Sequence, residues 1–271
     1  MTTRYVNTGS TAGGDGTTNG TSGATRAYAS LSEAEAAEQG NITASGILEI
    51  LCTGSSADTV KANFDNASWT TNSTNYVHIK PNTGQEHGGS YNTGVYRLDT
   101  GDNYSNTLDL GADFSRVSGI QTQSTANAML GINLVGGGSI VVERCIVKGS
   151  AATGLVGINS ILVNTLGNQS IIANNLIYDQ TGEGIKTLYR ANVEQAMYSN
   201  TIDSCGTGIL LSADTASSRY YNNLVTNCTT DWSGSAGANN DNNVTSDATS
   251  PNTAHRSKTI TYTDAAGGDF S

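Results

Sequence analysis

The segment Ala196-Met-Tyr-Ser-Asn200-Thr-Ile-Asp-Ser-Cys-Gly-Thr-Gly-Ile-Leu-Leu211 contains the pattern that decides the fold. A short strand leads to an Asn, a second short strand follows, and after a brief loop a third strand begins with Gly-Ile. Side chains on such strands alternate between two faces, which places the apolar residues on one side. A single unit cannot bury these residues alone, so the pattern predicts a stack of similar units.

Related segments recur along the chain at irregular intervals. Their first halves begin at Ser115, Val141, Ile171, Ala196 and Arg219, with a weaker copy at Asn242. The anchor positions are residues 119, 145, 175, 200, 223 and 243, so the period varies between 20 and 30 residues. The Gly-Ile half returns in register at Gly131, Gly157, Gly184 and Gly208. We therefore expect an all-β fold, a single-stranded right-handed parallel β-helix, and the main alternative is a β-sandwich of hairpins.

Four of the anchors are Asn residues, namely Asn175, Asn200, Asn223 and Asn243. Rungs of a β-helix stack about 4.8 Å apart, and like residues then align in ladders. We expect these Asn side chains to form a structural ladder, each amide bonding to the next rung at a bend. The bend favours residues that tolerate left-handed backbone angles, which fits Asn and also Gly119.

The two ends of the chain differ from the repeats. Residues 1–46 are expected to form an N-terminal cap with a short strand, a Gly-rich loop and one helix over 31–39. Ser30 and Glu33 have the spacing of a capping box, and Gly40 can end the helix. Residues 47–245 would hold the rungs, with early strands at 47–52, 76–79, 95–98 and 107–110. Residues 246–271 form a polar tail or cap, in which 259–262 and Phe270 would cover the other end.

These rungs resemble the parallel β-helix repeats of pectin-lyase-like proteins, over residues 105 to 245. The head resembles the N-terminal region of many bacterial and phage β-helix proteins, through Tyr5-Val-Asn-Thr8, Gly14-Asp-Gly-Thr17, Tyr28-Ala-Ser-Leu31 and Glu35-Ala36. The resemblance implies the fold and a phage or bacterial surface setting. It does not select a function, because this fold hosts lyases, hydrolases, tailspikes, adhesins and capsid-surface proteins.

Composition restricts the classes of partner. The 271 residues carry a formal net charge of −10, with a pI near 4.6. This balance argues against a nucleic-acid groove and against binding to an anionic membrane. No segment approaches the roughly 18 apolar residues of a membrane span. The polar start, Met1-Thr-Thr-Arg-Tyr5, does not look like a signal peptide, so we expect synthesis in a host cytoplasm and a place in a virion.

The residues that usually carry chemistry are scattered. The four Cys residues are widely spaced, which argues against a disulfide framework or a zinc site, and Cys145 is expected to be a buried thiol. Glycoside hydrolysis needs paired carboxylates, and the candidate pairs, Asp99 with Asp102 and Asp109 with Asp113, are expected in polar turns.

The Asp15 loop and the three histidines are also expected to have structural roles. Asp15 fits turn chemistry better than a calcium loop. His78, His87 and His255 show neither triad nor metal spacing. We therefore predict no catalytic residue, no metal and no cofactor.

Tyrosines are the remaining candidates for a binding surface. Tyr189, Tyr198, Tyr220 and Tyr221 fall in or near the rungs, where they could contact sugar or protein. The sequence is best interpreted as a non-catalytic structural protein of a phage particle, a capsid decoration or cement protein, with a capsid protein as partner and a homotrimer as its assembly. The alternatives are a carbohydrate-active β-helix, either a polysaccharide lyase or a tailspike depolymerase, and a cell-surface adhesin.

Overall fold

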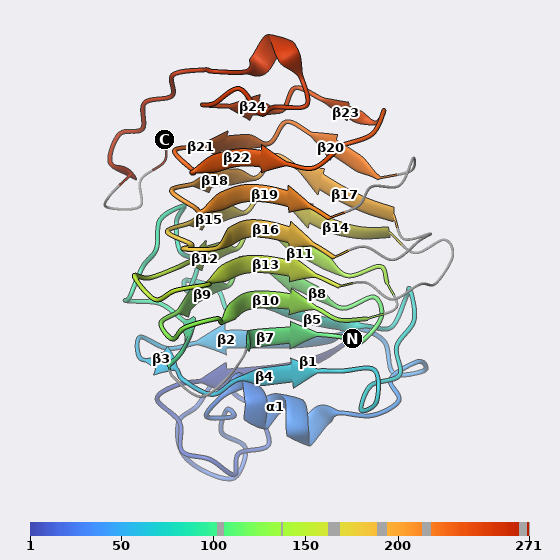
Figure 1. Ribbon diagram of the computed structural model, residues 1–271. Helices are drawn as coiled ribbons and strands as arrows, with labels where there is room; N and C mark the ends of the chain where they lie inside the picture. Colours follow the sequence, from blue (N-terminus) through green and yellow to red (C-terminus); the bar gives the residue numbers. More distant parts are fainter. Residues whose placement is uncertain are drawn as a thin grey trace.

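A computed structural model describes residues 1–101, 106–136, 138–161, 169–188, 194–212, 218–265 and 270. The strands pair in parallel and form three sheets that run the length of the molecule (Figure 1). Successive strands pass from the first sheet to the second and the third, and the next rung then begins again in the first. The fold is therefore mostly β and built as a parallel β-helix solenoid, which confirms that part of the prediction.

The strand bounds follow the three sheets. The first sheet contains β1 (Thr2–Asn7), β2 (Leu48–Thr53), β5 (Val77–Pro81), β8 (Arg116–Ser118), β11 (Val141–Glu143), β14 (Gln169–Ala173), β17 (Glu194–Tyr198), β20 (Arg219–Tyr221) and β23 (Asn240–Asp241). The second contains β3 (Ala57–Asp58), β6 (Arg97–Thr100), β9 (Gln121–Ser124), β12 (Ile146–Lys148), β15 (Leu176–Tyr178), β18 (Thr201–Asp203), β21 (Leu224–Thr226) and β24 (Val244–Thr245). The third contains β4 (Ala62–Phe64), β7 (Asn106–Leu110), β10 (Leu130–Leu134), β13 (Val156–Ser160), β16 (Glu183–Thr187), β19 (Thr207–Leu211) and β22 (Thr230–Ser233).

The core is a set of side-chain columns that run parallel to the stack. In the first sheet one inward column has at most 1% exposure at each position and consists of Val117, Val142, Ile172, Met197 and Tyr220. Full burial of such a side chain contributes about 1.5–3 kcal/mol. The stack therefore supplies the buried surface that one rung lacks.

The Gly-Ile motif of the third sheet has a steric cause. A Cβ atom on Gly184 would lie 2.6 Å from the carbonyl oxygen of Gly208 and 2.6 Å from Cγ2 of Ile202. Only glycine lets the neighbouring rung and the second sheet approach this closely. Ile185, the next residue, points into the core and is fully buried.

The left-handed corner lies one residue before the ladder position. Arg144, Asn174, Ser199, Asn222 and Asn242 have φ angles between 53° and 57° and each precedes an anchor residue. The expectation that the ladder Asn itself adopts this backbone is therefore wrong.

The first anchor is displaced by one residue for the same reason. Ser118 pairs with Glu143, so Gly119, with φ 66°, is equivalent to Arg144 rather than to Cys145. Ile120 occupies the ladder position of that rung.

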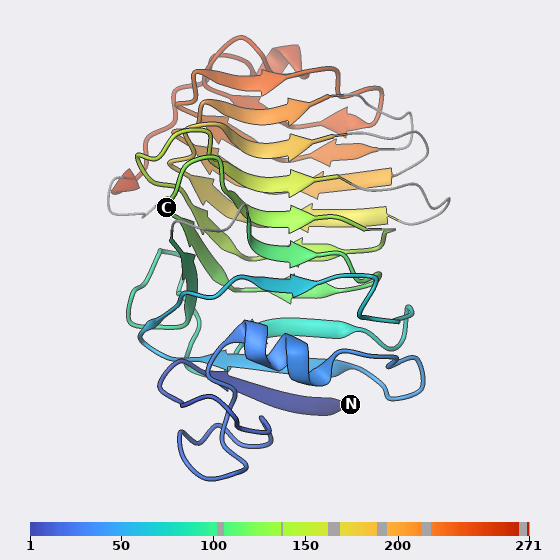
Figure 2. The ribbon, with the colours of Figure 1, turned by 60° about the horizontal axis from the view of Figure 1, so that its bottom comes forward.

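At the N-terminal end, α1 (Leu31–Glu38) lies against the first rungs, beside β1 and β4 (Figure 2). Ser30 Oγ accepts a hydrogen bond from Glu33 N at 3.0 Å, as the capping-box spacing predicts. The Glu33 carboxylate instead bonds Ala29 N at 2.7 Å, so only half of the box forms. Strand β1 pairs with β2 and is part of the first sheet.

The tail does not follow the predicted path. At the C-terminal end the chain that includes η1 (Thr253–His255) lies over the last rung (Figure 1). Ser250 Oγ donates to Asn243 O in that rung at 2.7 Å. Tyr262 and Phe270 instead return along the second sheet. The Tyr262 hydroxyl bonds Thr226 Oγ1 at 2.7 Å, and the Phe270 ring lies 5.1 Å from the Tyr178 ring. The expectation that these two aromatic residues cover the end is therefore wrong.

Candidate functional site

The four predicted ladder residues lie in adjacent rungs and bond to one another. Each is at most 2% exposed, and Nδ2 of Asn175, Asn200 and Asn223 donates to Oδ1 of the next Asn at 3.0, 2.9 and 2.9 Å. Each Nδ2 also donates to a backbone carbonyl, for example Asn200 to Ile172 O at 2.9 Å. The amides thus satisfy buried backbone groups at a corner where the strand ladder is interrupted.

The ladder has an end group on each side, of which the repeat revealed Cys145, as an anchor position, but not Asn252. At one end Cys145 N donates to Asn175 Oδ1 at 2.9 Å. At the other, Asn252 Oδ1 accepts from Asn243 N at 3.0 Å and from Asn243 Nδ2 at 3.2 Å. Asn252 lies outside the repeat and only nine residues after Asn243, so the period of 20 to 30 residues could not identify it.

The predicted tyrosines separate into different environments. Tyr198 and Tyr221 are partners in adjacent strands, half-buried, with ring centroids 6.0 Å apart and planes 8° from parallel. Tyr220 is 1% exposed and packs edge-on against Trp232 in the core, because alternation turns it inward between two outward residues. It therefore does not belong to a binding face. Tyr189 lies outside the described residues.

One outward column of the first sheet joins this Tyr pair to a polar cluster. Register pairs connect Ser118, Glu143, Ala173, Tyr198 and Tyr221 in consecutive rungs. The same face is therefore polar in the earlier rungs and aromatic in the later ones. This difference follows from register alone and would be visible in the sequence once the rungs are aligned correctly.

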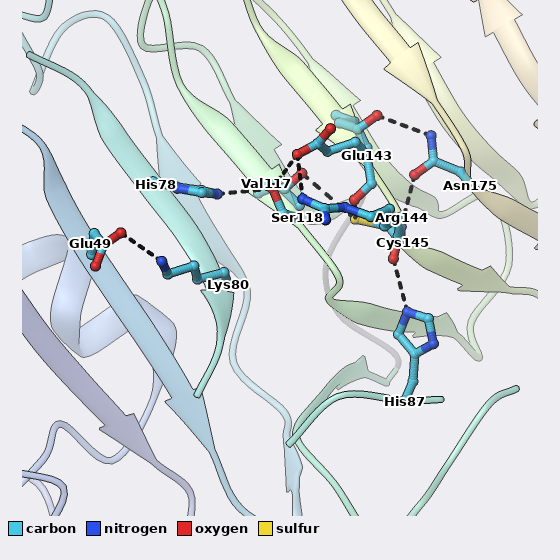
Figure 3. A network of polar contacts seen from close by, with 11 residues as sticks. Glu49, His78, Lys80, His87, Val117, Ser118, Glu143, Arg144, Cys145 and Asn175 are labelled. Carbon is cyan, nitrogen blue, oxygen red and sulfur yellow. Dashed lines mark hydrogen bonds and ion pairs between the residues drawn. The ribbon is translucent and has the colours of Figure 1, made fainter. Parts of the chain in front are cut away.

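The polar cluster centres on the Ser118 hydroxyl (Figure 3). His78 Nε2 lies 2.9 Å from Ser118 Oγ, which donates to Glu143 Oε1 at 3.1 Å. Arg144 forms an ion pair with the same Glu143 oxygen at 2.8 Å. His78 has no triad spacing in the sequence, which does not reveal this contact because 40 residues separate His78 from Ser118.

Hydrogen-bond roles restrict what this cluster can do. A hydroxyl has one proton, so while Ser118 donates to Glu143, its contact with His78 is a hydrogen bond only in the tautomer that has the proton on Nε2. A general base would have to accept the Ser proton instead. Burial, and next the positive charge of Lys80, lowers the pKa of His78 to about 4. His78 is therefore neutral at neutral pH.

A hollow of ≈ 460 Å³ lies over this cluster and is bounded by the loop that follows β5. His87 from that loop contacts the rungs, since its Nε2 lies 2.9 Å from Arg144 O while its Nδ1 accepts from Gly89 N at 3.0 Å. Lys80 is paired with Glu49 at 2.6 Å. The charged groups of the hollow thus already have partners within the chain.

The predicted acid pairs do not form a site in the described residues. Asp109 lies in strand β7 rather than in a turn, is 6% exposed and pairs with Lys61 at 2.6 Å. Asp113 Oδ1 is buried without a hydrogen bond. Burial raises the pKa of Asp99, and Asp102 lies outside the described residues. Asp15 accepts from Thr17 N at 2.9 Å, which is turn chemistry.

No group of three metal-ligating side chains occurs in the described ranges. None of their helices is long and apolar enough to span a membrane. Comparison of the chain with family models, with curated proteins and with solved structures gives no match. The geometry of the described surface is therefore the basis for assigning a function.

Proposed function

We propose that this is a non-catalytic structural protein of a phage particle, held on the capsid surface as a decoration or cement protein. The observation that carries the proposal is the hydrogen-bond arrangement at Ser118, where the hydroxyl donates to Glu143 and His78 bonds to it only as a donor. A cluster bonded in this way stabilises adjacent rungs instead of activating a nucleophile.

We also propose the finer features of the fold. The coil is right-handed and of the pectin-lyase-like type, since a parallel crossover is right-handed in about 98% of cases. The helix α1 and the loop before it cap the N-terminal end, where Leu31 and Ala34 are fully buried against the core. A capped coil exposes no unpaired rung to another copy, which suits a protein that assembles by its sides.

The proposed contact surface is the aromatic half of the outward column, with a capsid protein as the occupant. Tyr198 and Tyr221 stack on each other, so each ring covers one face of the other, and their edges and hydroxyls are proposed to contact the partner. Sugar binding would use a free ring face, whereas tyrosine edges and hydroxyls suit a protein interface. Arg219 in the neighbouring outward column is exposed and adds a charge to the rim.

The proposal is tested by co-sedimentation of the purified protein with heads of the phage that encodes it, after the native copy has been stripped off. Wild type should bind, and the double variant Tyr198→Ser with Tyr221→Ser should bind at least about tenfold more weakly. Leu210→Ser is the matched control, because Leu210 lies on the outward face of β19 in the same rung as Tyr198. Absence of wild-type binding, or equal binding by the double variant, would contradict the proposal.

We propose a homotrimer as the assembled form, because a capsid lattice offers three-fold positions. Mass photometry of the protein released from heads should give three times the 28.0 kDa of one chain. A monomer as the released form would remove this part of the proposal.

A carbohydrate-active protein is the second candidate, and the hollow beside His78 and Ser118 is the observation that favours it. The test is incubation with acidic polysaccharides, followed by measurement of new reducing ends and unsaturated products. If wild type turns over a polysaccharide and Ser118→Ala abolishes the turnover, the carbohydrate-active function replaces the structural one.

A further inference from the structure

Two cysteines occupy equivalent corners in adjacent rungs. Register pairs Ile202 with Val225 and Asp203 with Thr226, so Cys205 and Cys228 follow at the same place in each rung. The residues immediately before them, Ser204 and Asn227, both have left-handed φ angles, of 54° and 55°. Neighbouring positions of this kind have Cα atoms about 5 Å apart, within the roughly 4.4–6.8 Å that a disulfide spans.

The Cys228 sulfur also contacts the backbone of Cys205. Cys205 N donates to Cys228 Sγ at 3.4 Å, and Thr229 N donates to Cys205 O at 3.0 Å, which fixes the rungs against each other on both sides of Cys228. The side-chain hydrogen bond with Cys205, followed by burial, raises the pKa of the Cys228 thiol.

Cys228 is the most exposed of the four cysteines. It is half-buried, whereas Cys205 is 4% exposed and lines an open hollow of ≈ 750 Å³ together with Ser204 and Asn227. Cys52 and Cys145 are at most 1% exposed. Burial raises the pKa of the Cys145 thiol to about 12, and the pKa of the Cys228 thiol is raised as well, so the pair is distinguished by its position in adjacent rungs and not by its acidity.

We propose that Cys205 and Cys228 form a disulfide between adjacent rungs when the folded protein meets a low-molecular-weight disulfide such as oxidised glutathione. The thiolate of Cys228, the more exposed of the two, attacks one sulfur of the oxidant, breaks its S–S bond and releases one glutathione thiolate. The Cys205 thiolate then attacks the Cys228 sulfur of the mixed disulfide and releases the second glutathione. Two protein thiols are oxidised, one glutathione disulfide is reduced, and two protons pass to solvent or to the released thiolates.

This site goes beyond the proposed function and does not depend on it. The link would join the last full rungs of the coil and oppose their separation at the C-terminal end. It would form once the protein leaves a reducing compartment. The raised pKa of Cys228 makes the reaction slow at neutral pH and faster under mildly alkaline conditions.

The test uses the full chain, incubated folded with oxidised glutathione at mildly alkaline pH, then alkylated, digested with trypsin and mapped without reduction. The expected product joins the peptides 191–219 and 220–256, which contain Cys205 and Cys228. The intact mass falls by that of two hydrogens, two of the four thiols remain, and reductant reverses the change. The thermal midpoint should be higher for the oxidised protein.

Single variants give the control. Cys205→Ser should leave Cys228 as a glutathione adduct and show no peptide link, with a circular dichroism spectrum like that of wild type. Four alkylated thiols after oxidation of wild type, a stable adduct without a link, or a link that includes Cys52 or Cys145 would overturn the proposal.

Discussion

Asn175 and Asn200 are bonded twice across one rung, since both Nδ2 and the backbone N of Asn175 donate to Oδ1 of Asn200, at 3.0 and 3.1 Å. One amide oxygen therefore satisfies two buried donors, and the amide nitrogen of Asn200 continues the chain to Asn223. A carboxylate could not donate, and a hydroxyl could not span both directions. This relationship explains why Asn recurs at the corner and leads to the first prediction.

Asn200→Ala should lower the free energy of unfolding by about 2–4 kcal/mol, because it leaves buried donors of Asn175 and the Ile172 carbonyl without partners. Urea denaturation measures the loss. Asn222→Gly is the matched control, since Asn222 is exposed and left-handed, and it should change stability by less than about 0.5 kcal/mol. A loss below about 1 kcal/mol for Asn200→Ala would show that the ladder is not a stabilising element.

Ser199 has a φ of 53° where the neighbouring rungs have Asn174 and Asn222. Ser199→Asn should leave stability unchanged or raise it slightly, because Asn tolerates the left-handed region better than Ser. Ser199→Val should cost about 1–2 kcal/mol by the strain of a β-branched residue there. The two variants are compared by thermal unfolding, and a more stable Val variant would contradict the corner assignment.

Asn252 ends the ladder, so Asn252→Ala should destabilise the protein by about 1–2 kcal/mol through the unpaired amide of Asn243. Hydrogen exchange should show the loss first in the last rungs, near β23 and β24. The exposed neighbour Thr253 provides the control, and Thr253→Ala should have no effect on exchange. Equal effects of the two variants would remove Asn252 from the ladder.

His78 predicts a pH dependence. Its pKa is about 4 in the folded protein, against about 6.5 in an unfolded chain, so between these values the unfolded chain binds more protons. The contribution is complete above about pH 6.5 and is lost as the pH falls toward 4. After allowance for solvent screening we expect about 1–2 kcal/mol.

The measurement is urea unfolding of wild type and His78→Gln across this pH range. The Gln amide can still donate to Ser118 but does not titrate, so the variant should lose less stability on acidification. The same slope in both proteins would contradict the assignment of the neutral His78.

The repeat predicts the fold because the inward apolar residues and the corner Asn recur at equivalent sequence positions from rung to rung. It did not place Gly119 correctly, since Gly and Asn both tolerate left-handed backbone and the pattern could not tell which of two adjacent residues bends. The contact between His78 and Ser118 depends on how the strands that carry them align. A long loop separates these strands, so their register cannot be derived from the spacing in the sequence. The prediction that Tyr220 lies on a binding face is wrong because side chains alternate along Arg219 to Tyr221, which turns Tyr220 inward between two outward residues.

The central claim is that this coil serves as a structural protein on a capsid, and electron cryomicroscopy of purified native particles tests it most directly. The account predicts density for the stacked coil at fixed lattice positions on the shell, with the face of Tyr198 and Tyr221 toward a capsid protein. Particles that lack the protein, or that carry it only at the tail, would contradict the claim.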